Sequence, residues 1–353
     1  SAAPPFTTST LQQEASKALN FPISKTMRIA QQLYEGVDIK GEGTVGLITY
    51  LRTDSTRVSE EAERMAEEFI GAKYGEAYLA ETVAAKKENR NIQDAHEAIR
   101  PTFIENTSIE GTAQEKKLYD LIWKRTVASQ MADASVMRTD IKVASDKGDE
   151  LFNVQATQIL FDGFLKLYME SSDDPGQDDE TVILPEMHVG DKMTEHGISA
   201  ECKYTSAPSR YTDASLIKKL DELGIGRPST YRPTIETLTK ARGYVVKGDK
   251  PGEKHTVTNL RLKDGKITSS SKTETIGAEK GRLLPQDIGM IVTDYLVKHF
   301  DSVLDYSFTA NVEEDFDRIA DGEIVWNALI SEFYDPFHSK VQESLSNREY
   351  SNV

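Results

Sequence analysis

The pattern of apolar and polar positions over the first 135 residues predicts helices separated by a single strand. Apolar side chains recur at helical spacing in four stretches, which begin at Thr10, Ser24, Ser59 and Gln114. The first stretch opens with a capping box of Thr10 and Gln13, Gly36 ends the second, and Ser59 caps the third before an acidic first turn. These features predict a helical first domain over residues 1–135.

One stretch of this domain has a different period. Residues 45–52 alternate between the two faces of an extended chain, which predicts a strand with Tyr50 and Arg52 on the same face. The segment continues as Thr53, Asp54 and Ser55, so its end carries more reactive side chains than a strand end requires.

Beyond residue 135 the pattern becomes strand-like and then helical again. Four strands are predicted between residues 136 and 208, in MRTDIKVAS, LFNVQATQI, TVILPEM and ISAECKYT, and the acidic SSDDPGQDDE is predicted to be a solvated loop. Residues 209–340 are predicted to be helical, with one short hairpin that turns at Lys-Asp-Gly, and residues 341–353 form a tail. The fold class expected is multi-domain α+β, mainly helical with a β-rich segment.

Composition and charge narrow the possible functions. The net charge of −16 argues against a nucleic-acid partner, but the acidic residues concentrate in SSDDPGQDDE and NVEEDFDRIADGE, and a groove needs only local positive charge. The single cysteine, Cys202, excludes an internal disulfide framework and a cysteine-rich zinc site in this chain. No apolar run of membrane-spanning length and no signal-peptide pattern are present, so a cytoplasmic setting is expected.

The first candidate site is the pair Tyr50 and Arg52. A phenol is a poor nucleophile unless a nearby cation stabilises the phenolate, and an arginine can do so while also gripping a phosphate. The alternative is a half-buried strand tyrosine beside a surface arginine, which is common.

The second candidate is QDAHEAIRPT. His96 and Glu97 suggest a zinc motif, but Arg100 stands where the second histidine is needed. On a helical turn, His96 and Arg100 share a face, which suits a phosphate better than a metal. The alternative is a helix end with a local pair of Glu97 and Arg100.

The third candidate is GIGRPSTYRPT. Gly224 and Gly226 allow tight turns, Ser229 or Thr230 can cap the helix that follows, and Arg227 precedes that helix start. A phosphate can bind against such a group, with Arg242 as a second contact. The alternative is an ordinary capped junction between loop and helix.

Taken together and in this order, GLITYLRTDSTR, AHEAIRPT and GIGRPSTY resemble the type IA DNA topoisomerases. PFTTSTLQQEAS and SRYTDASLIKKLDELG are similar to the same family, and the resemblance covers residues 4–340. The form with Leu51 after the tyrosine, together with AHEAIRP, resembles bacterial topoisomerase I more than topoisomerase III, which usually has proline there.

The resemblance implies a reaction and roles for residues. Tyr50 would attack a phosphodiester of single-stranded DNA to give a 5′-phosphotyrosyl link, Arg52 would position the phosphate, and His96 would act with them. Strand passage and religation would relax negatively supercoiled DNA without ATP. The remaining motif residues implied to bind DNA are Thr53, Asp54, Ser55, Glu97, Arg100, Arg210, Arg227, Ser229, Thr230, Tyr231 and Arg242.

The chain also departs from the family pattern. A Toprim domain with acidic ligands for Mg²⁺ does not precede residue 1, the first arch segments are absent, and no zinc ribbon follows. Arg232 stands where the third motif usually has a small residue. We therefore expect a central fragment with an incomplete gate and arch, with no metal ligand of its own and no zinc. Such a fragment would be inactive alone and monomeric or weakly self-associating, while the bacterial protein would be nucleoid-associated.

Three alternatives remain open. The first is a non-catalytic fragment that binds single-stranded DNA, and the second is part of a topoisomerase III-like decatenase. A different tyrosine transferase, such as a recombinase or a replication-initiator nuclease, would place a histidine pair or an Arg-His-Arg set around the tyrosine, and the lone His96 fits neither.

Overall fold

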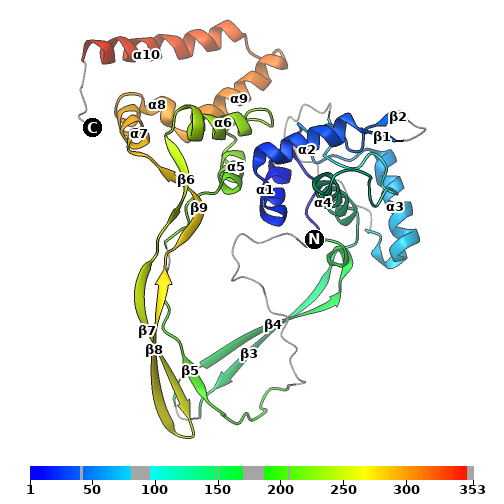
Figure 1. The fold of residues 1–353 in the computed structure, drawn as a ribbon, viewed down its shortest axis with the longest axis vertical. Helices are drawn as coiled ribbons and strands as arrows, with labels where there is room; N and C mark the ends of the chain where they lie inside the picture. The colour runs from blue at the N-terminus through cyan, green and yellow to red at the C-terminus, as the bar shows by residue number, and fades with distance from the viewer. Residues whose placement is uncertain are drawn as a thin grey trace.

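The computed structural model describes residues 1–39, 43–80, 96–146, 148–149, 151–169, 187–205 and 207–347, with backbone only for residues 37–39. Helices of the N-terminal part form one lobe, the helices after residue 212 form a second group beside it, and long strands extend from both (Figure 1). The fold is therefore mixed α+β, as the sequence predicted. None of the described helices is long and apolar enough to cross a membrane.

The N-terminal lobe contains the four predicted helices, which are α1 (Thr8–Leu19), α2 (Ile23–Glu35), α3 (Glu60–Tyr74) and α4 (Ala113–Ser129). Ser59 caps α3 and Gly36 ends α2, as predicted. The capping box of α1 was predicted one turn too late, because Thr7 is its N-cap and pairs with Thr10. The second helix likewise begins earlier than Ser24, directly after Pro22.

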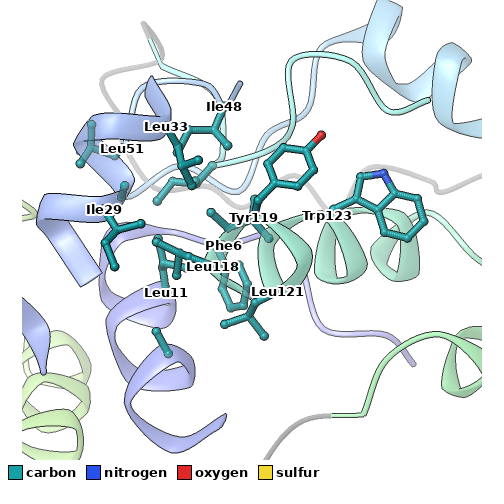
Figure 2. Close-up of a cluster of buried hydrophobic side chains, with 14 of the residues drawn as sticks. Phe6, Leu11, Ile29, Leu33, Ile48, Leu51, Leu118, Tyr119, Leu121 and Trp123 are labelled. Carbon is teal, nitrogen blue, oxygen red and sulfur yellow. The ribbon is translucent and has the colours of Figure 1, made fainter. Parts of the chain in front are cut away.

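The core of this lobe is built around α4. Figure 2 shows Leu118, Tyr119, Leu121 and Trp123 of this helix among side chains of α1, α2 and residues 48–51. The polar ends of its two large aromatic residues are satisfied by backbone carbonyls, because the Tyr119 hydroxyl donates to Asn106 and the Trp123 indole N–H to Ile104, both at 2.7 Å. The burial raises the pKa of the Tyr119 phenol well above its ordinary value.

Two antiparallel strands leave the lobe after α4. β3 (Ser135–Ala144) pairs with β4 (Leu151–Phe161), and both match predicted strands. The base of this ribbon is held by the short helices η1 (Glu76–Tyr78) and η2 (Gly163–Lys166): the Tyr78 hydroxyl donates to Asp162 at 2.7 Å. Gly163 has a φ of +47°, and a Cβ there would lie 2.5 Å from the carbonyl oxygen of Ala132.

Further strands form the long ribbon on the other side of Figure 1. β5 (Ile198–Ala200), β7 (Glu253–Lys263) and β8 (Lys266–Ile276) form one sheet, and β6 (Val245–Lys250) pairs with β9 (Glu279–Pro285). The predicted hairpin is present and turns at Asp264 and Gly265, which both have positive φ, the geometry that Asp-Gly favours. Its two strands have 11 residues each.

Two small hairpin strands, β1 (Val37–Ile39) and β2 (Gly43–Val45), lie between α2 and the tyrosine segment. The predicted acidic loop SSDDPGQDDE lies outside the described residues, as does most of the predicted strand TVILPEM. β5 pairs with β7, so the predicted β-rich segment shares a sheet with the third predicted domain. The domain limits therefore remain a prediction.

The helices of the C-terminal group are α5 (Asp213–Glu222), α6 (Tyr231–Glu236), α7 (Asp287–His299), α8 (Asp301–Leu304), α9 (Tyr306–Ala320) and α10 (Trp326–Ser346). α6 continues into η3 (Thr237–Ala241), a single turn with π-helical bonding. α5 packs against α1, and Ile217, Tyr231 and Ile235 join the core of the N-terminal lobe. The first and third sequence motifs therefore lie on elements that share one core.

Candidate functional site

Tyr50 lies in an irregular extended segment. The prediction of a strand over residues 45–52 is wrong beyond Val45, where β2 ends, and only Ile48 forms an isolated bridge, with Pro101. The backbone of residue 47 is instead bonded to α2, because the Leu47 N–H donates to the Leu33 carbonyl at 2.8 Å. The segment of residue 101 and helix α2 therefore both hold this stretch, but neither pairs with it as a continuous strand.

The second motif is also extended, so the predicted helical turn at His96–Arg100 is wrong. Thr49 holds this segment: its N–H donates to the Arg100 carbonyl at 2.9 Å, its hydroxyl donates to the carbonyl of Ala98 at 2.6 Å, and the same hydroxyl accepts from the Arg100 N–H at 3.0 Å. Ile99 bridges Phe6 on its other side. Pairing across the chain, and not a shared helix face, therefore brings His96 to Tyr50.

The backbone after Tyr50 is fixed by Thr8, the first residue of α1. The buried Thr8 hydroxyl donates to the carbonyl of Leu51 at 2.7 Å and accepts from the Thr53 N–H at 2.9 Å. The Thr8 N–H donates to the Thr53 carbonyl at 2.9 Å. Sequence analysis missed Thr8 as a site residue, although it lies in PFTTSTLQQEAS, a stretch that resembles the family.

The Tyr50 ring is half-buried between two other rings. It meets Tyr34 edge-on at a centroid distance of 5.4 Å and His96 at 5.0 Å with the planes tilted by 32°. Arg52 is exposed, and among the described residues no hydrogen bond or cation–π contact joins it to Tyr50. The phenol is thus not sealed in the apolar core, and the nearest titratable ring is His96.

Arg100 is already engaged within the protein. Its Nε donates to the Glu97 carboxylate at 2.6 Å, and its side chain is 15% exposed. Glu97 also accepts from the Ser59 N–H at 3.3 Å. Burial alone would raise the pKa of Glu97, but the hydrogen bond and charge of Arg100, together with Ser59, outweigh it and lower the pKa. The local pair that was the alternative for this motif is therefore present, and it ties residues 97–100 to the start of α3.

The three residues that follow Arg52 differ sharply in exposure. Thr53 and Ser55 are each 2% exposed. The Thr53 hydroxyl accepts from the Ser55 N–H at 3.0 Å, and the Ser55 hydroxyl accepts from the Arg57 N–H at 3.2 Å. These contacts favour a role in shaping the loop over direct DNA contact, whereas Asp54 is exposed.

The third motif forms a tight loop before α6. Gly224 and Gly226 have φ of +68° and +89°, as the prediction of tight turns requires. The predicted helix cap is wrong, because the Thr230 hydroxyl accepts from the Arg227 N–H at 2.8 Å and makes no capping bond to α6. Ser229 is exposed and makes no capping bond.

Tyr231 connects this loop to the first motif. Its hydroxyl donates to Asp221 at 2.9 Å, and burial first, then the charge of Asp221, raise the pKa of the phenol. The carboxylate of Asp54 raises this pKa as well, so Asp54 lies within electrostatic reach of the loop. The structure therefore brings the first and third motifs together.

The remaining predicted arginines differ in their partners. Arg227 lies near Glu313 and Asp317 of α9, at 3.5 and 3.6 Å. Arg210 is paired with Glu279 of β9 at 2.6 Å. The backbone N–H of Arg210, followed by its side-chain hydrogen bond, lowers the pKa of that carboxyl. Arg242 is exposed and has no ion pair with any residue that the structure describes.

The site as a whole offers a half-exposed phenol, an adjacent imidazole and several arginines, on backbone fixed by buried hydrogen bonds. This is chemistry suited to a phosphodiester. Within the described parts of the chain, no group of three or more histidine, cysteine, aspartate or glutamate side chains is placed to hold a metal ion.

Comparisons with known proteins agree with this reading of the site. The chain is similar to the full-length topoisomerase I from Thermotoga maritima, with a TM-score of 0.68 and 34% sequence identity over 96% of this chain and 50% of that one. It therefore spans about half the length of that relative. A family model described as DNA topoisomerase matches residues 1–263. The chain belongs to the bacterial DNA topoisomerase family.

Proposed function

We propose that this chain carries the nucleophile and part of the DNA gate of a type IA topoisomerase. In this proposal the longer protein relaxes negatively supercoiled DNA without ATP, by cutting one strand, passing another through the gap and resealing the cut. The relaxation activity is proposed for the whole protein, because this chain spans about half of its Thermotoga maritima relative.

The setting of Tyr50 carries the proposal. Its ring lies between those of Tyr34 and His96, which restricts the direction of the phenol, and it is only half-buried, so a DNA strand can approach. The residue after it is held by the Thr8 hydroxyl, and His96 lies against its ring. A nucleophile needs such a fixed position, because misplacement by about 1 Å can cost roughly 100-fold in rate.

The reaction follows from the phenol. The Tyr50 oxygen attacks the phosphorus of a single-stranded phosphodiester and loses its proton, and the bond from phosphorus to the 3′ oxygen breaks. The DNA is left with a 5′-phosphotyrosyl end, and the departing 3′ oxygen gains a proton. Religation reverses these steps. Since one phosphodiester is exchanged for another, the bond energy is conserved and no ATP is required.

Other side chains would bind and orient the strand. Arg52 is exposed two residues after the nucleophile and would contact the scissile phosphate. His96 would hold the phenol and the DNA backbone in place. Arg227, Ser229 and Arg242 would contact the strand from the second helical group. Arg100, which is paired with Glu97, would act by positioning His96 and Thr49.

Magnesium is proposed as the cofactor of the whole enzyme. Among the described residues, no cluster of acidic, histidine or cysteine side chains is placed to hold it. The ligands are proposed to belong to a Toprim domain, and the 353-residue chain by itself is expected neither to relax nor to cleave DNA efficiently.

The test is to trap the covalent intermediate. The chain is joined to the N-terminal magnesium-binding region of a type IA enzyme, incubated with a single-stranded oligonucleotide labelled at its 3′ end, and denatured with detergent. We expect a labelled protein band that disappears in Tyr50→Phe and persists in the matched control Tyr334→Phe, on exposed α10.

Three results would contradict parts of the proposal. Adduct formation by Tyr50→Phe would remove Tyr50 as the nucleophile. Salt-dependent binding of the oligonucleotide with no adduct in any variant would instead favour the non-catalytic, single-strand-binding alternative. Magnesium-dependent relaxation by the 353-residue chain alone would contradict its proposed inactivity.

A further inference from the structure

α9 lies along the loop that contains the third motif. A Cβ on Gly224 would be 3.3 Å from the Cβ of Ala310, so the loop and the helix are in close contact there. Glu313 and Asp317 follow Ala310 on the same face of α9, three and seven residues later. The carboxylates of both residues are directed at Arg227, which lies in the loop.

The ion pairs that Arg227 makes with these acids are loose. The distances from its nitrogens are 3.5 Å to Glu313 and 3.6 Å to Asp317, whereas a charge-assisted hydrogen bond is about 2.7–2.9 Å long. The only side-chain hydrogen bond that Arg227 donates among the described residues goes to the carbonyl of Gly226. Most of its N–H donors are therefore still available, and the side chain is 35% exposed.

We propose that Glu313 and Asp317 form an acid clasp, which competes with DNA phosphate for the Arg227 guanidinium. This inference rests on the proposed function, in which Arg227 binds the single strand. Partly exposed ion pairs of this length are weak, whereas a phosphate can bind arginine through two parallel hydrogen bonds. A strand that offers its phosphate in the right place displaces the acids, and one that does not is repelled by them.

The clasp gives the second helical group a way to discriminate between strands. The charges of Glu313 and Asp317 lower the affinity for any phosphate, but the loss is smallest where geometry permits a bidentate contact with Arg227. The two carboxylates also keep the binding of the strand weak. An enzyme that must release and reseal DNA requires such weak binding. The two acids thereby orient the Arg227 guanidinium, and no tight internal salt bridge occupies the N–H donors that a phosphate would need.

The experiment measures binding of the 353-residue chain to a fluorescein-labelled oligothymidine of about 12 nucleotides, by fluorescence anisotropy. The test variant is Glu313→Gln with Asp317→Asn, which removes both charges and keeps the shapes. The matched control is Glu314→Gln with Asp321→Asn, which removes the same charge from α9 and its C-terminal cap residue without touching Arg227. Thermal unfolding confirms that each variant is folded, and the single substitutions are measured beside the double variant.

We expect the test variant to bind roughly three- to ten-fold more tightly than the natural chain at about 50 mM salt, with the gain largely gone at about 500 mM. The control variant should gain less than half as much. In an Arg227→Gln background the same two substitutions should give no gain beyond that of the control, because the competition is for that guanidinium.

The outcomes separate the clasp from the function beneath it. Equal or weaker binding by the test variant, or the same gain in the control or in the Arg227→Gln background, would overturn the clasp while leaving DNA binding in place. Absence of any binding by the natural chain would overturn the proposed function as well.

Discussion

The hydroxyl of Thr8 is predicted to be the main support of the backbone that follows Tyr50. It is fully buried, donates to the Leu51 carbonyl at 2.7 Å and accepts from the Thr53 N–H at 2.9 Å. Thr8→Val keeps the shape of the side chain and removes the hydroxyl. A buried N–H and a buried carbonyl then lose their partner, at about 1–3 kcal/mol each, so we expect a destabilisation of about 2–6 kcal/mol.

Thr8→Ser is the matched variant, because it keeps the hydroxyl and loses one methyl group, worth about 1 kcal/mol. Urea unfolding followed by the fluorescence of buried Trp123 measures both, in a Trp326→Phe background that removes the exposed second tryptophan. On the proposed function, Thr8→Val should also reduce the trapped DNA adduct roughly 10- to 100-fold. If Thr8→Val proved no less stable than Thr8→Ser, the buried hydrogen bonds would not support this loop.

Two further predictions concern the second motif and the base of the β3–β4 ribbon. Glu97→Gln should destabilise the protein by about 1.5–3 kcal/mol at neutral pH, because Arg100 loses a charged partner. The folded pKa of Glu97 is lowered, so its contribution is present above the ordinary value of 4.5 and lost as pH falls through the lowered value; the variant should show a shallower loss of stability in acid urea titrations. Gly163→Ala should cost about 3 kcal/mol or more, since its Cβ would strike a backbone carbonyl, while Gly265→Ala, with positive φ but open space, should cost only about 1 kcal/mol. Similar losses in the two glycine variants would show that the close approach at Gly163 is unimportant.

The sequence by itself determined the features that depend on local pattern. The 3.6-residue period fixed α4, a serine before an acidic first turn fixed the start of α3, and Asp264-Gly265 fixed the turn of the long hairpin. The motifs around Tyr50, Arg100 and Arg227 were sufficient to identify the family, because side-chain types at fixed spacing can be recognised without knowledge of the fold.

Tertiary structure decided what those motif residues touch. The segment of Tyr50 looked like a strand by its alternation, yet strand formation needs a continuous neighbour, and its partners are α2, the segment of residue 101 and the start of α1. The burial of Thr53 follows from the same packing.

The partners of the charged residues were also beyond the sequence. The spacing of His96 and Arg100 fitted a helical turn. Hydrogen bonds to Thr49 and Phe6 instead hold this segment in an extended conformation, because backbone hydrogen bonds to distant segments outweigh a weak local helix preference. Nothing local to Arg227 indicates that carboxylates of α9 face it. Side chains distant in sequence come into contact only because packing of the core brings their helices and loops together. No period or spacing along the chain indicates such a contact.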